Sequence, residues 1–281
     1  MKLTVVVTTF NRAASLEKVL WSLNAQTRLP DEVVVSDDGS SQDVHQSLKR
    51  YADSLSFDLV FVRQEDRGFR LARCRNNGVR AASGDYIVFL DQDIVATPGY
   101  LDLYARHAKP AEFLVAYPVM LDERQSDALS LETIRRGDCA VVASGDQLGK
   151  VRSQYRKDTF YRFLRRVSGR GSRPKVRGGA FGVSMADFAR VNGFDENYVG
   201  WGAEDDDLGR RLYKAGVKGR TVFLHDFPIH LWHAHSTGGE DSVNLAYYDR
   251  RMRAVARGDW RAPNGLSSPL DDDTPVVTRL K

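Results

Sequence analysis

The sequence predicts an α/β fold with a Rossmann-like, mostly parallel central sheet flanked by helices. Three observations lead to this prediction. Short runs of apolar and β-branched residues recur through the first 90 residues, stretches with a helical spacing of apolar residues separate them, and three runs end in polar residues, at 8–9, 37–38 and 91–93. Alternating strands and helices form βαβ units, whose parallel sheet is buried on both faces.

The first half of the chain supplies these elements in order. The run from Leu3 to Val7 indicates a buried strand. Asn11 is expected to cap a helix that continues to about Ala25, because the apolar residues that follow recur on one helical face. The remaining elements are strands at 32–36, 59–62 and 86–90 and helices at 43–55 and 71–82.

The second half is less regular. Strands are expected at 115–120, 140–144 and 221–224, and helices at 186–192 and at 204–215, where Gly216 ends the second helix. Residues 266–281 are polar, acidic and proline-bearing, which predicts a flexible tail. We therefore expect a single domain over residues 1–265, with halves at 1–110 and 111–265.

Composition and charge narrow the class of protein. The chain has 281 residues, of which 42% are hydrophobic, enough to build a core. It lacks a run of about 20 apolar residues, and its N-terminal apolar run is too short for a signal peptide, so a cytoplasmic location is expected. Cys74 and Cys139 cannot form a disulfide framework. The net charge is +4, yet residues 150–177 hold eleven Lys or Arg and one acid, Asp158.

The polar strand ends predict a binding site, because ligands bind beyond the carboxyl ends of parallel strands. Asp91 and Asp93 could hold Mg²⁺ or Mn²⁺ together with phosphate oxygens, although such a pair alone also fits a solvated turn. His230, His233 and His235 follow later, and on a strand the last two would share a face. One of them is expected to be a third metal ligand, with surface or core histidines as the alternative.

Four acids, Glu204 to Asp207, open the predicted helix at 204–215. Acids in a first turn stabilise a helix by roughly 0.3–1 kcal/mol each through its dipole, but four adjacent acids also repel one another. Asp205 shares a face with Leu208 and Leu212, so we expect it to point inward, beside Trp201. A desolvated carboxylate near like charges has a raised pKa, which suits a general base.

Two other features have more than one interpretation. The glycines at 178–179 and 200–202 let the backbone approach a ligand or simply pack tightly, and Trp201 between them could stack on a sugar ring. The basic segment 150–177 is interleaved with aromatic residues, so it could face an anionic membrane, bind nucleic acid or form a solvated arm. No nucleic-acid-binding motif is present, and no nucleic-acid partner is expected.

Taken together, these motifs resemble those of glycosyltransferases of the GT-A fold, family two. The resemblance rests in the first half on VVVTTFNR, VVVSDDGS and VFLDQD, and residues 63–93 resemble bacterial chondroitin-polymerase-type transferases. The stretch from Arg177 to Gly216 is similar to the C-terminal motif of β-1,4-galactosyltransferase-type enzymes, whose core WGxEDxD appears here as WGAEDDD. The likeness covers about residues 3–235, and it implies a nucleotide-sugar-binding half at 1–110 and an acceptor-binding half at 111–265.

The resemblance also implies a role for each matching residue. Asp205 would be the catalytic base, Trp201 and Asp206 would bind the acceptor, and the metal would be held by Asp93 with His233 or His235. His233 aligns best, and His235 leaves the choice ambiguous. The residues expected at the donor nucleotide sugar are Thr8, Phe10, Arg12, Asp38, Arg73, Arg75, Asp91, Gly179 and Glu204.

The implied activity is inverting, Mn²⁺- or Mg²⁺-dependent transfer of a hexose or N-acetylhexosamine from a UDP-sugar to a hydroxyl of a glycan or lipid-linked glycan, with a galactose-type sugar favoured. It implies bacterial surface polysaccharide or lipopolysaccharide synthesis, with a peripheral location on the inner face of the cytoplasmic membrane. A non-catalytic sugar-nucleotide-binding or scaffold protein is an alternative, which the intact acids at 204–207 disfavour. A nucleotidyltransferase would need a glycine-rich basic loop after the first strand, and residues 7–11 do not provide it.

Overall fold

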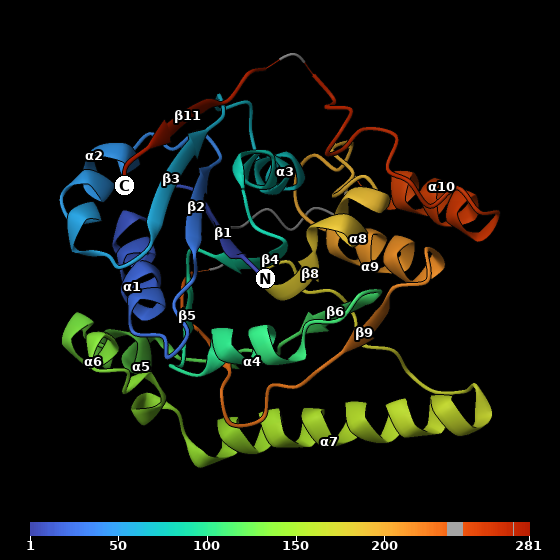
Figure 1. The fold of residues 1–281 in the computed structure, drawn as a ribbon, viewed down its shortest axis with the longest axis horizontal. Coiled ribbons are helices and arrows are strands. Elements are labelled where there is room, and N and C mark those ends of the chain that lie inside the picture. The colour runs from blue at the N-terminus through green and yellow to red at the C-terminus, as the bar shows by residue number, and fades with distance from the viewer. Residues whose placement is uncertain (235–243, 272) are drawn as a thin grey trace.

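The computed structural model describes residues 1–234, 244–271 and 273–281. In this part of the chain the larger sheet has eight strands, in the order β11-β3-β2-β1-β4-β8-β6-β9 (Figure 1). Strands β1 to β4 are parallel, as predicted, whereas β8 and β11 run antiparallel to β4 and β3. The strands are β1 (Leu3–Thr9), β2 (Glu32–Asp37), β3 (Asp58–Arg63), β4 (Tyr86–Asp91), β6 (Glu112–Val115), β8 (Ala180–Ser184), β9 (Lys218–Arg220) and β11 (Val276–Arg279).

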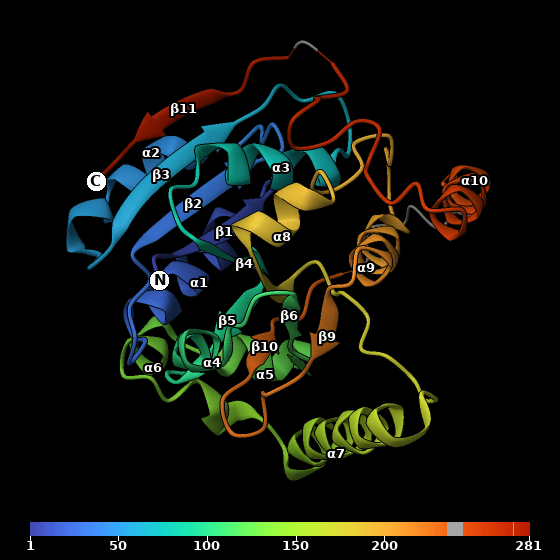
Figure 2. The same cartoon turned by 45° about the vertical axis from the view of Figure 1, so that its right-hand side comes forward.

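Helices cover both faces of this sheet. Helices α1 (Ala13–Asn24) and α2 (Val44–Lys49) lie on one side, and α3 (Leu71–Ala81) and α8 (Met185–Arg190) lie on the other (Figure 2). Alternate residues of each strand serve the two cores, so Val5 packs with the first pair of helices and Val6 with the second. Burial on both faces explains why these strands read as continuous apolar runs.

A smaller sheet has three described strands, in the order β5-β10-β7. They are β5 (Ile94–Ala96), β10 (Pro228–His230) and β7 (Val119–Met120). The single strand expected at 115–120 is therefore divided, because β6 ends at Val115 in the large sheet and β7 joins the small one. The pairing of β10 with β5 is antiparallel and sets His230 opposite Ile94, which is three residues after the end of β4.

Several local expectations were wrong. Residues 139–142 form a 3₁₀ turn instead of the strand at 140–144, and β9 ends before the strand expected at 221–224. Asn11 does not cap α1; its φ is 51°, and its Oδ1 accepts hydrogen bonds from the N–H groups of Ser41 (2.8 Å) and Gln42 (3.1 Å). Helices that were not predicted are α4 (Tyr100–His107), α5 (Glu123–Ala128), α6 (Leu131–Arg135) and α10 (Leu245–Ala256).

Most of the basic segment is one helix, α7 (Gly145–Ser168), which lies along the bottom edge of the molecule in Figure 1. Ser144 and Gln147 form a capping box at its start, and Gly169 ends it in the left-handed conformation, with φ of 70°. No helix within the described ranges combines the length and the hydropathy needed to cross a bilayer.

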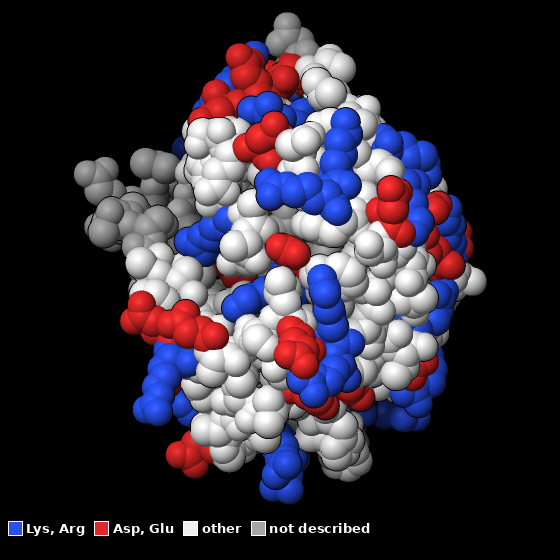
Figure 3. Space-filling view, turned by 90° about the vertical axis from the view of Figure 1, so that its left-hand side faces the viewer, with Lys and Arg blue, Asp and Glu red and all other residues white. Residues whose placement is uncertain are grey.

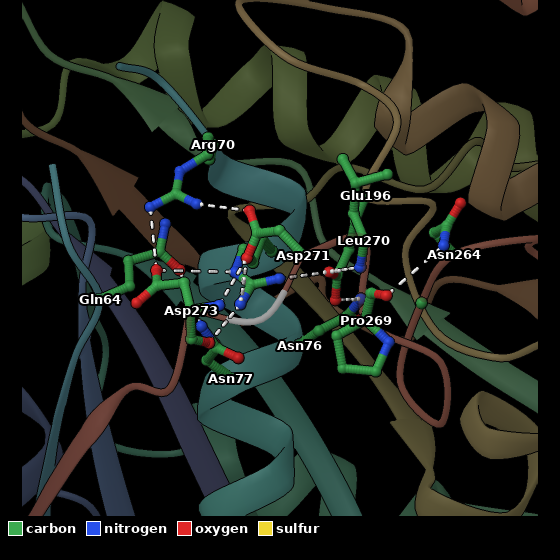
Figure 4. Close-up of polar contacts among 12 residues, drawn as sticks. Gln64, Arg70, Asn76, Asn77, Glu196, Asn264, Pro269, Leu270, Asp271 and Asp273 are labelled. Carbon is green, nitrogen blue, oxygen red and sulfur yellow. Dashed lines mark hydrogen bonds and ion pairs between the residues drawn. The ribbon is translucent and has the colours of Figure 1, made fainter. Parts of the chain in front are cut away.

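The segment 266–281 differs from the flexible tail that its composition predicted. Strand β11 pairs with β3 and completes the edge of the large sheet. Asp271 and Asp273 approach α3, where Arg70 Nη1 lies 3.1 Å from Asp271 Oδ2 and Arg70 Nη2 lies 3.1 Å from Asp273 Oδ2 (Figure 4). The Arg70 side chain is buried, so these carboxylates compensate a charge that would otherwise be desolvated and unpaired.

Candidate active site

The carboxyl ends of β1 and β4 meet at one rim of the sheet. Thr8 and Asp91 are paired in register, and Thr8 Oγ1 donates a hydrogen bond of 2.8 Å to Asp91 Oδ1. Gln92 accepts from the Thr9 hydroxyl (2.7 Å) and from the Phe10 N–H (2.8 Å), which ties the two strand ends together. The ring of Phe10 is left partly exposed beside them. The predicted convergence of polar strand ends is therefore present.

A cluster of one carboxylate and two imidazoles lies next to this rim. His233 Nε2 is 3.3 Å from Asp93 Oδ2, and His230 Nε2 is 3.7 Å from Asp93 Oδ1. One ligand atom from each of the three residues lies within 4.8 Å of the others. The Leu231 N–H donates to the Asp93 carbonyl oxygen (2.9 Å), which holds the histidine segment against the turn after β4. His235, the other expected ligand, lies outside the described residues.

The chemistry of this cluster fits a divalent metal ion. Burial and the neighbouring Asp91 raise the pKa of Asp93, against the opposing effect of His230, His233 and Arg12. A buried carboxylate of this kind is stabilised by a nearby cation, and a set of one carboxylate and two imidazoles suits Mn²⁺ better than Ca²⁺. Arg12, expected at the donor nucleotide sugar, places Nη1 3.3 Å from Asp93 Oδ2.

Arg75 is the centre of a second cluster, which joins β4 to α9 (Glu204–Lys214). Its side chain is only 2% exposed, and its guanidinium lies 3.2 Å from Asp91, 3.4 Å from Glu204 and 3.0 Å from Asp205. The three carboxylates raise the pKa of Arg75 in spite of its burial, so the group stays charged. One buried cation thus brings together three residues that the sequence assigned to the donor and to catalysis.

Asp205 has a defined position within this cluster. Its Oδ2 accepts a hydrogen bond of 2.8 Å from the Gly178 N–H, and its side chain is 32% exposed. Desolvation raises the pKa of Asp205, while Arg75 and the Gly178 N–H oppose the rise. For the adjacent Glu204, burial and the charge of Asp205 raise the pKa to about 7. Asp205 faces the rim and not the core, so the expectation that it points inward holds only in part.

The glycines at 178 and 179 make room for these charged groups. A Cβ atom at Gly178 would lie 2.3 Å from the Arg75 guanidinium, and one at Gly179 would lie 2.4 Å from an oxygen of Asp91. A side chain at either position would therefore displace the Arg75 guanidinium or the Asp91 carboxylate from its place in the site. Gly179 adjoins Asp91, which is consistent with the donor-side position expected for it.

The other two acids of α9 have separate partners. Asp206 lies 3.2 Å from Lys175 and 3.0 Å from Arg210, and it accepts from the Tyr248 hydroxyl. Asp207 is fully buried, and its Oδ2 accepts a hydrogen bond of 2.5 Å from Arg211 Nε. Each of the four adjacent acids thus has its own cation or shares Arg75, which explains how α9 tolerates them.

Asp38 lies buried at the end of β2, as the resemblance implied for a nucleotide contact. Its Oδ2 accepts a hydrogen bond from the Arg70 N–H (3.0 Å), and its Oδ1 accepts from Gln64. Burial raises the pKa of Asp38 to about 6 in spite of these bonds. Ionising this buried carboxyl group costs free energy, and its presence is therefore consistent with a functional role for Asp38.

Arg73 does not reach the rim. Its guanidinium is buried between Glu196 (3.1 Å) and Asp271 (2.7 Å), away from the residues around Arg75. Arg73, one of the two arginines of this helix expected at the donor, thus pairs with Glu196 and with Asp271 of the C-terminal segment, two residues that Figure 4 labels. Arg73 and Arg75 both lie on α3, and the sequence of this helix could not show which of them reaches the rim, because their partners come from distant parts of the chain.

Trp201 lies in a loop just before α9, and its side chain is 72% exposed. Gly200, Gly202 and Ala203 all have positive φ, of 82°, 96° and 76°. Ala203 thus adopts a left-handed conformation that favours glycine. The Asn244 side chain donates to the Gly202 carbonyl oxygen (3.0 Å), which fixes the loop from outside.

Comparison with protein families gives two matches. The family described as glycosyl transferase family 2 matches residues 4–171, and the family described as N-terminal domain of galactosyltransferase matches residues 158–234. The chain is 37% identical to validoxylamine A glucosyltransferase of Streptomyces hygroscopicus subsp. limoneus over 89% of this chain and 56% of that protein. It is 29% identical to chondroitin synthase of Escherichia coli over 78% of this chain and 33% of that protein.

A solved structure supports the fold. The structure of GalNAc-T7 with UDP, GalNAc and Mn²⁺ matches 90% of this chain and 48% of that chain, with a TM-score of 0.63 and 18% identity. The chain therefore has the GT-A fold that the sequence predicted. It spans between a third and somewhat more than half of the length of the two relatives named above.

Proposed function

This chain belongs to glycosyl transferase family 2 and is a glycosyltransferase, and we propose that it transfers a hexose or N-acetylhexosamine from a UDP-sugar to a hydroxyl group with inversion at the anomeric carbon. The observation that carries the proposal is the position of Arg75, which links Asp91 at the donor rim to Asp205. A galactose-type sugar is our first choice of donor, because of the match at 158–234.

The donor is proposed to bind along the ends of β1, β2 and β4. Asp38 and Thr8 flank the place of the nucleoside, and Phe10 offers a partly exposed ring for stacking. Asp93, His230 and His233 would hold the divalent metal ion, Mn²⁺ or Mg²⁺, which supplies positive charge to the diphosphate of the departing UDP. Support comes from the Mn²⁺ and UDP named in the GalNAc-T7 structure.

Asp205 is proposed to act as the general base. Its carboxylate takes the proton from the acceptor hydroxyl while that oxygen bonds to the anomeric carbon and the bond to UDP breaks, so no covalent enzyme intermediate is needed. The raised pKa of Asp205 favours proton uptake, and its partial exposure leaves it accessible to an acceptor. Arg75 and the Gly178 N–H hold the carboxylate in place.

The acceptor is proposed to be a glycan or a lipid-linked glycan that lies against Trp201 and Asp206. The exposed indole offers an apolar face to a sugar ring, and Asp206 can accept hydrogen bonds from sugar hydroxyls. We place the reaction in the cytoplasm, at the inner face of the membrane, in the synthesis of a surface polysaccharide or lipopolysaccharide. Validoxylamine A, which the name of the glucosyltransferase relative contains, is the second candidate acceptor.

The deciding experiment measures UDP-sugar binding by calorimetry and UDP release, with and without Mn²⁺. Metal-dependent binding of one UDP-sugar by wild type and by Asp205→Asn, with UDP release lost only in the variant, supports the proposal. Asp249→Asn, an exposed change on α10, is the matched control. Metal-dependent binding without turnover in the wild type favours the non-catalytic sugar-nucleotide-binding alternative, and absence of any UDP binding rejects the proposal.

A further inference from the structure

Helix α7 carries an exposed apolar stripe. The side chains of Phe160, Phe163 and Val167 are 60%, 64% and 69% exposed. Their spacing of three and then four residues places them on one face of the helix. Exposed aromatic rings at such a spacing are unusual on a soluble surface and indicate a face that meets another surface.

The stripe continues into positive charge. Arg152 and Arg156 precede Phe160 by eight and four residues, so they extend the same face toward the start of α7. Arg152 and Arg156 are exposed, and neither forms an ion pair with any residue in the described ranges. By contrast, Arg70, Arg73 and Arg75 are each neutralised by carboxylates.

The opposite face of α7 is attached to the protein. Val151 and Asp158, seven residues apart, are buried, and the Asp158 carboxylate bonds to the Tyr117 side chain. Near the start of the helix, the Gln147 side chain donates to the Met120 carbonyl oxygen. The arginine and phenylalanine stripe therefore points away from the body. Elsewhere the surface differs, because the face shown in Figure 3 has basic and acidic side chains interspersed.

We propose that the stripe Arg152–Arg156–Phe160–Phe163–Val167 docks α7 on an anionic lipid surface. A helix that lies in a membrane interface needs an apolar face to enter the headgroup region and basic residues to meet the acidic headgroups, and α7 supplies both over about 36 Å of length. Unpaired bases of a nucleic acid could stack on the two phenyl rings, but the aliphatic Val167 that continues the same apolar face suits a lipid surface. Charge and apolar surface together therefore favour lipid.

The position of α7 gives this surface a function. At one end the helix contacts Met120 on β7, which pairs with His230 in the small sheet. At the other end residues 169–177 lead directly to Gly178, whose N–H holds Asp205. The lipid-facing helix is thus connected at both ends to the candidate site. Resting on the proposed function, this arrangement would present the site to acceptors carried on lipid.

The test uses the full chain and vesicles of phosphatidylcholine, with or without phosphatidylglycerol, in a flotation assay. We expect binding to the anionic vesicles only, weakened by salt. Phe160→Ser with Phe163→Ser, and separately Arg152→Gln with Arg156→Gln, should each reduce the bound fraction by about tenfold. Arg136→Gln, an exposed arginine on another surface, is the matched control and should bind as wild type.

Equal binding to both kinds of vesicle, or binding that neither double variant changes, would overturn the inference. So would binding of an RNA or DNA oligonucleotide that the arginine variant loses while vesicles stay unbound. Melting temperature and UDP-sugar turnover of the same variants show whether they are folded. Vesicle binding by a protein without turnover would reject the proposed function and keep the inference, and turnover without vesicle binding would do the reverse.

Discussion

Nη1 of Arg75 lies 3.0 Å from Oδ1 of Asp205, so the proposed base is held by a buried cation before any substrate is present. The same guanidinium also contacts Asp91 at the end of β4. Asp91, at the proposed donor site, and Asp205, the proposed base, are therefore coupled through the side chain of Arg75, and the position of one carboxylate depends on that of the other. Gly178 supports both, because it donates to Asp205 and leaves space for Arg75.

The first prediction concerns Asp205→Asn. If the carboxylate removes the acceptor proton, kcat should fall by about 10²–10⁴-fold, because an amide cannot act as a base. The dissociation constant for UDP should change little. Steady-state transfer rates and calorimetry check both parts, and an equal loss of rate and UDP affinity would assign Asp205 to donor binding.

The second prediction is the pH dependence of transfer. Desolvation raises the pKa of Asp205, so the inactive, protonated form persists to a higher pH than for an ordinary aspartate near 3.8. The rate should fall as pH is lowered through this raised pKa. A pH profile of kcat measures this fall in rate at acidic pH. Asp205→Glu should show the same fall, displaced along the pH axis. A profile unchanged by this substitution would contradict the role of Asp205.

The third prediction is that Asp38→Asn stabilises the protein but impairs donor binding. The rise of the Asp38 pKa from 3.8 to about 6 corresponds to an ionisation cost on the order of 3 kcal/mol. A raised pKa means that stability is full below 3.8 and is lost as pH rises through 6. At pH 8 the variant should therefore unfold at a higher urea concentration than wild type. Near pH 4 the two proteins should unfold at the same urea concentration. The variant should bind UDP more weakly than wild type.

The fourth prediction separates His230 and His233 from other histidines. Alanine at either position should weaken Mn²⁺ binding by at least about tenfold, because each removes one imidazole from the cluster with Asp93. Saturating Mn²⁺ should raise the melting temperature of wild type and have a smaller effect on these variants. His225→Ala, at an exposed site, is the control, and equal Mn²⁺ affinity in all three variants would exclude the cluster as the metal site.

The fifth prediction concerns the C-terminal segment. Asp273→Asn should lower the free energy of unfolding by about 1–3 kcal/mol, because buried Arg70 loses one of its two carboxylates. The Arg70 N–H also holds Asp38, so UDP affinity should fall as well. Urea unfolding and calorimetry measure the two effects. Asp58→Asn, which breaks only the exposed contact of Arg279 with β3, should change neither.

The parallel core and its polar rim could be predicted because both are local patterns. Strands β1, β2 and β4 are continuous apolar runs, so their burial could be predicted from the sequence. Their carboxyl ends could be expected at a common edge because the strands are parallel. His230 could not be assigned in the same way. We expected a strand that brought His233 and His235 to one face, but β10 ends at His230, so His233 lies beyond the strand, and His235 lies outside the described residues.

The errors about Arg73 and residues 266–281 have one cause. The composition of the C-terminal segment is that of a disordered chain, and the spacing of α3 gives no sign that Arg70 and Arg73 need counter-charges. These acids and these arginines meet only in the folded protein, and Arg70 and Asp271 are 201 residues apart in the sequence. Local sequence patterns could therefore identify neither the arginines nor the aspartates as members of these ion pairs.

The pairing of β11 with β3 sets a limit on when this protein can complete its fold. Strand β3 leaves the ribosome more than 200 residues before β11 does, and until then its outer edge has no partner. During this interval the nascent chain also lacks Asp271 and Asp273, so Arg70 has neither of these carboxylates and Arg73 has only Glu196. The N-terminal half must therefore wait for late synthesis, and chaperones that cover the unpaired β3 edge should increase the yield of native protein.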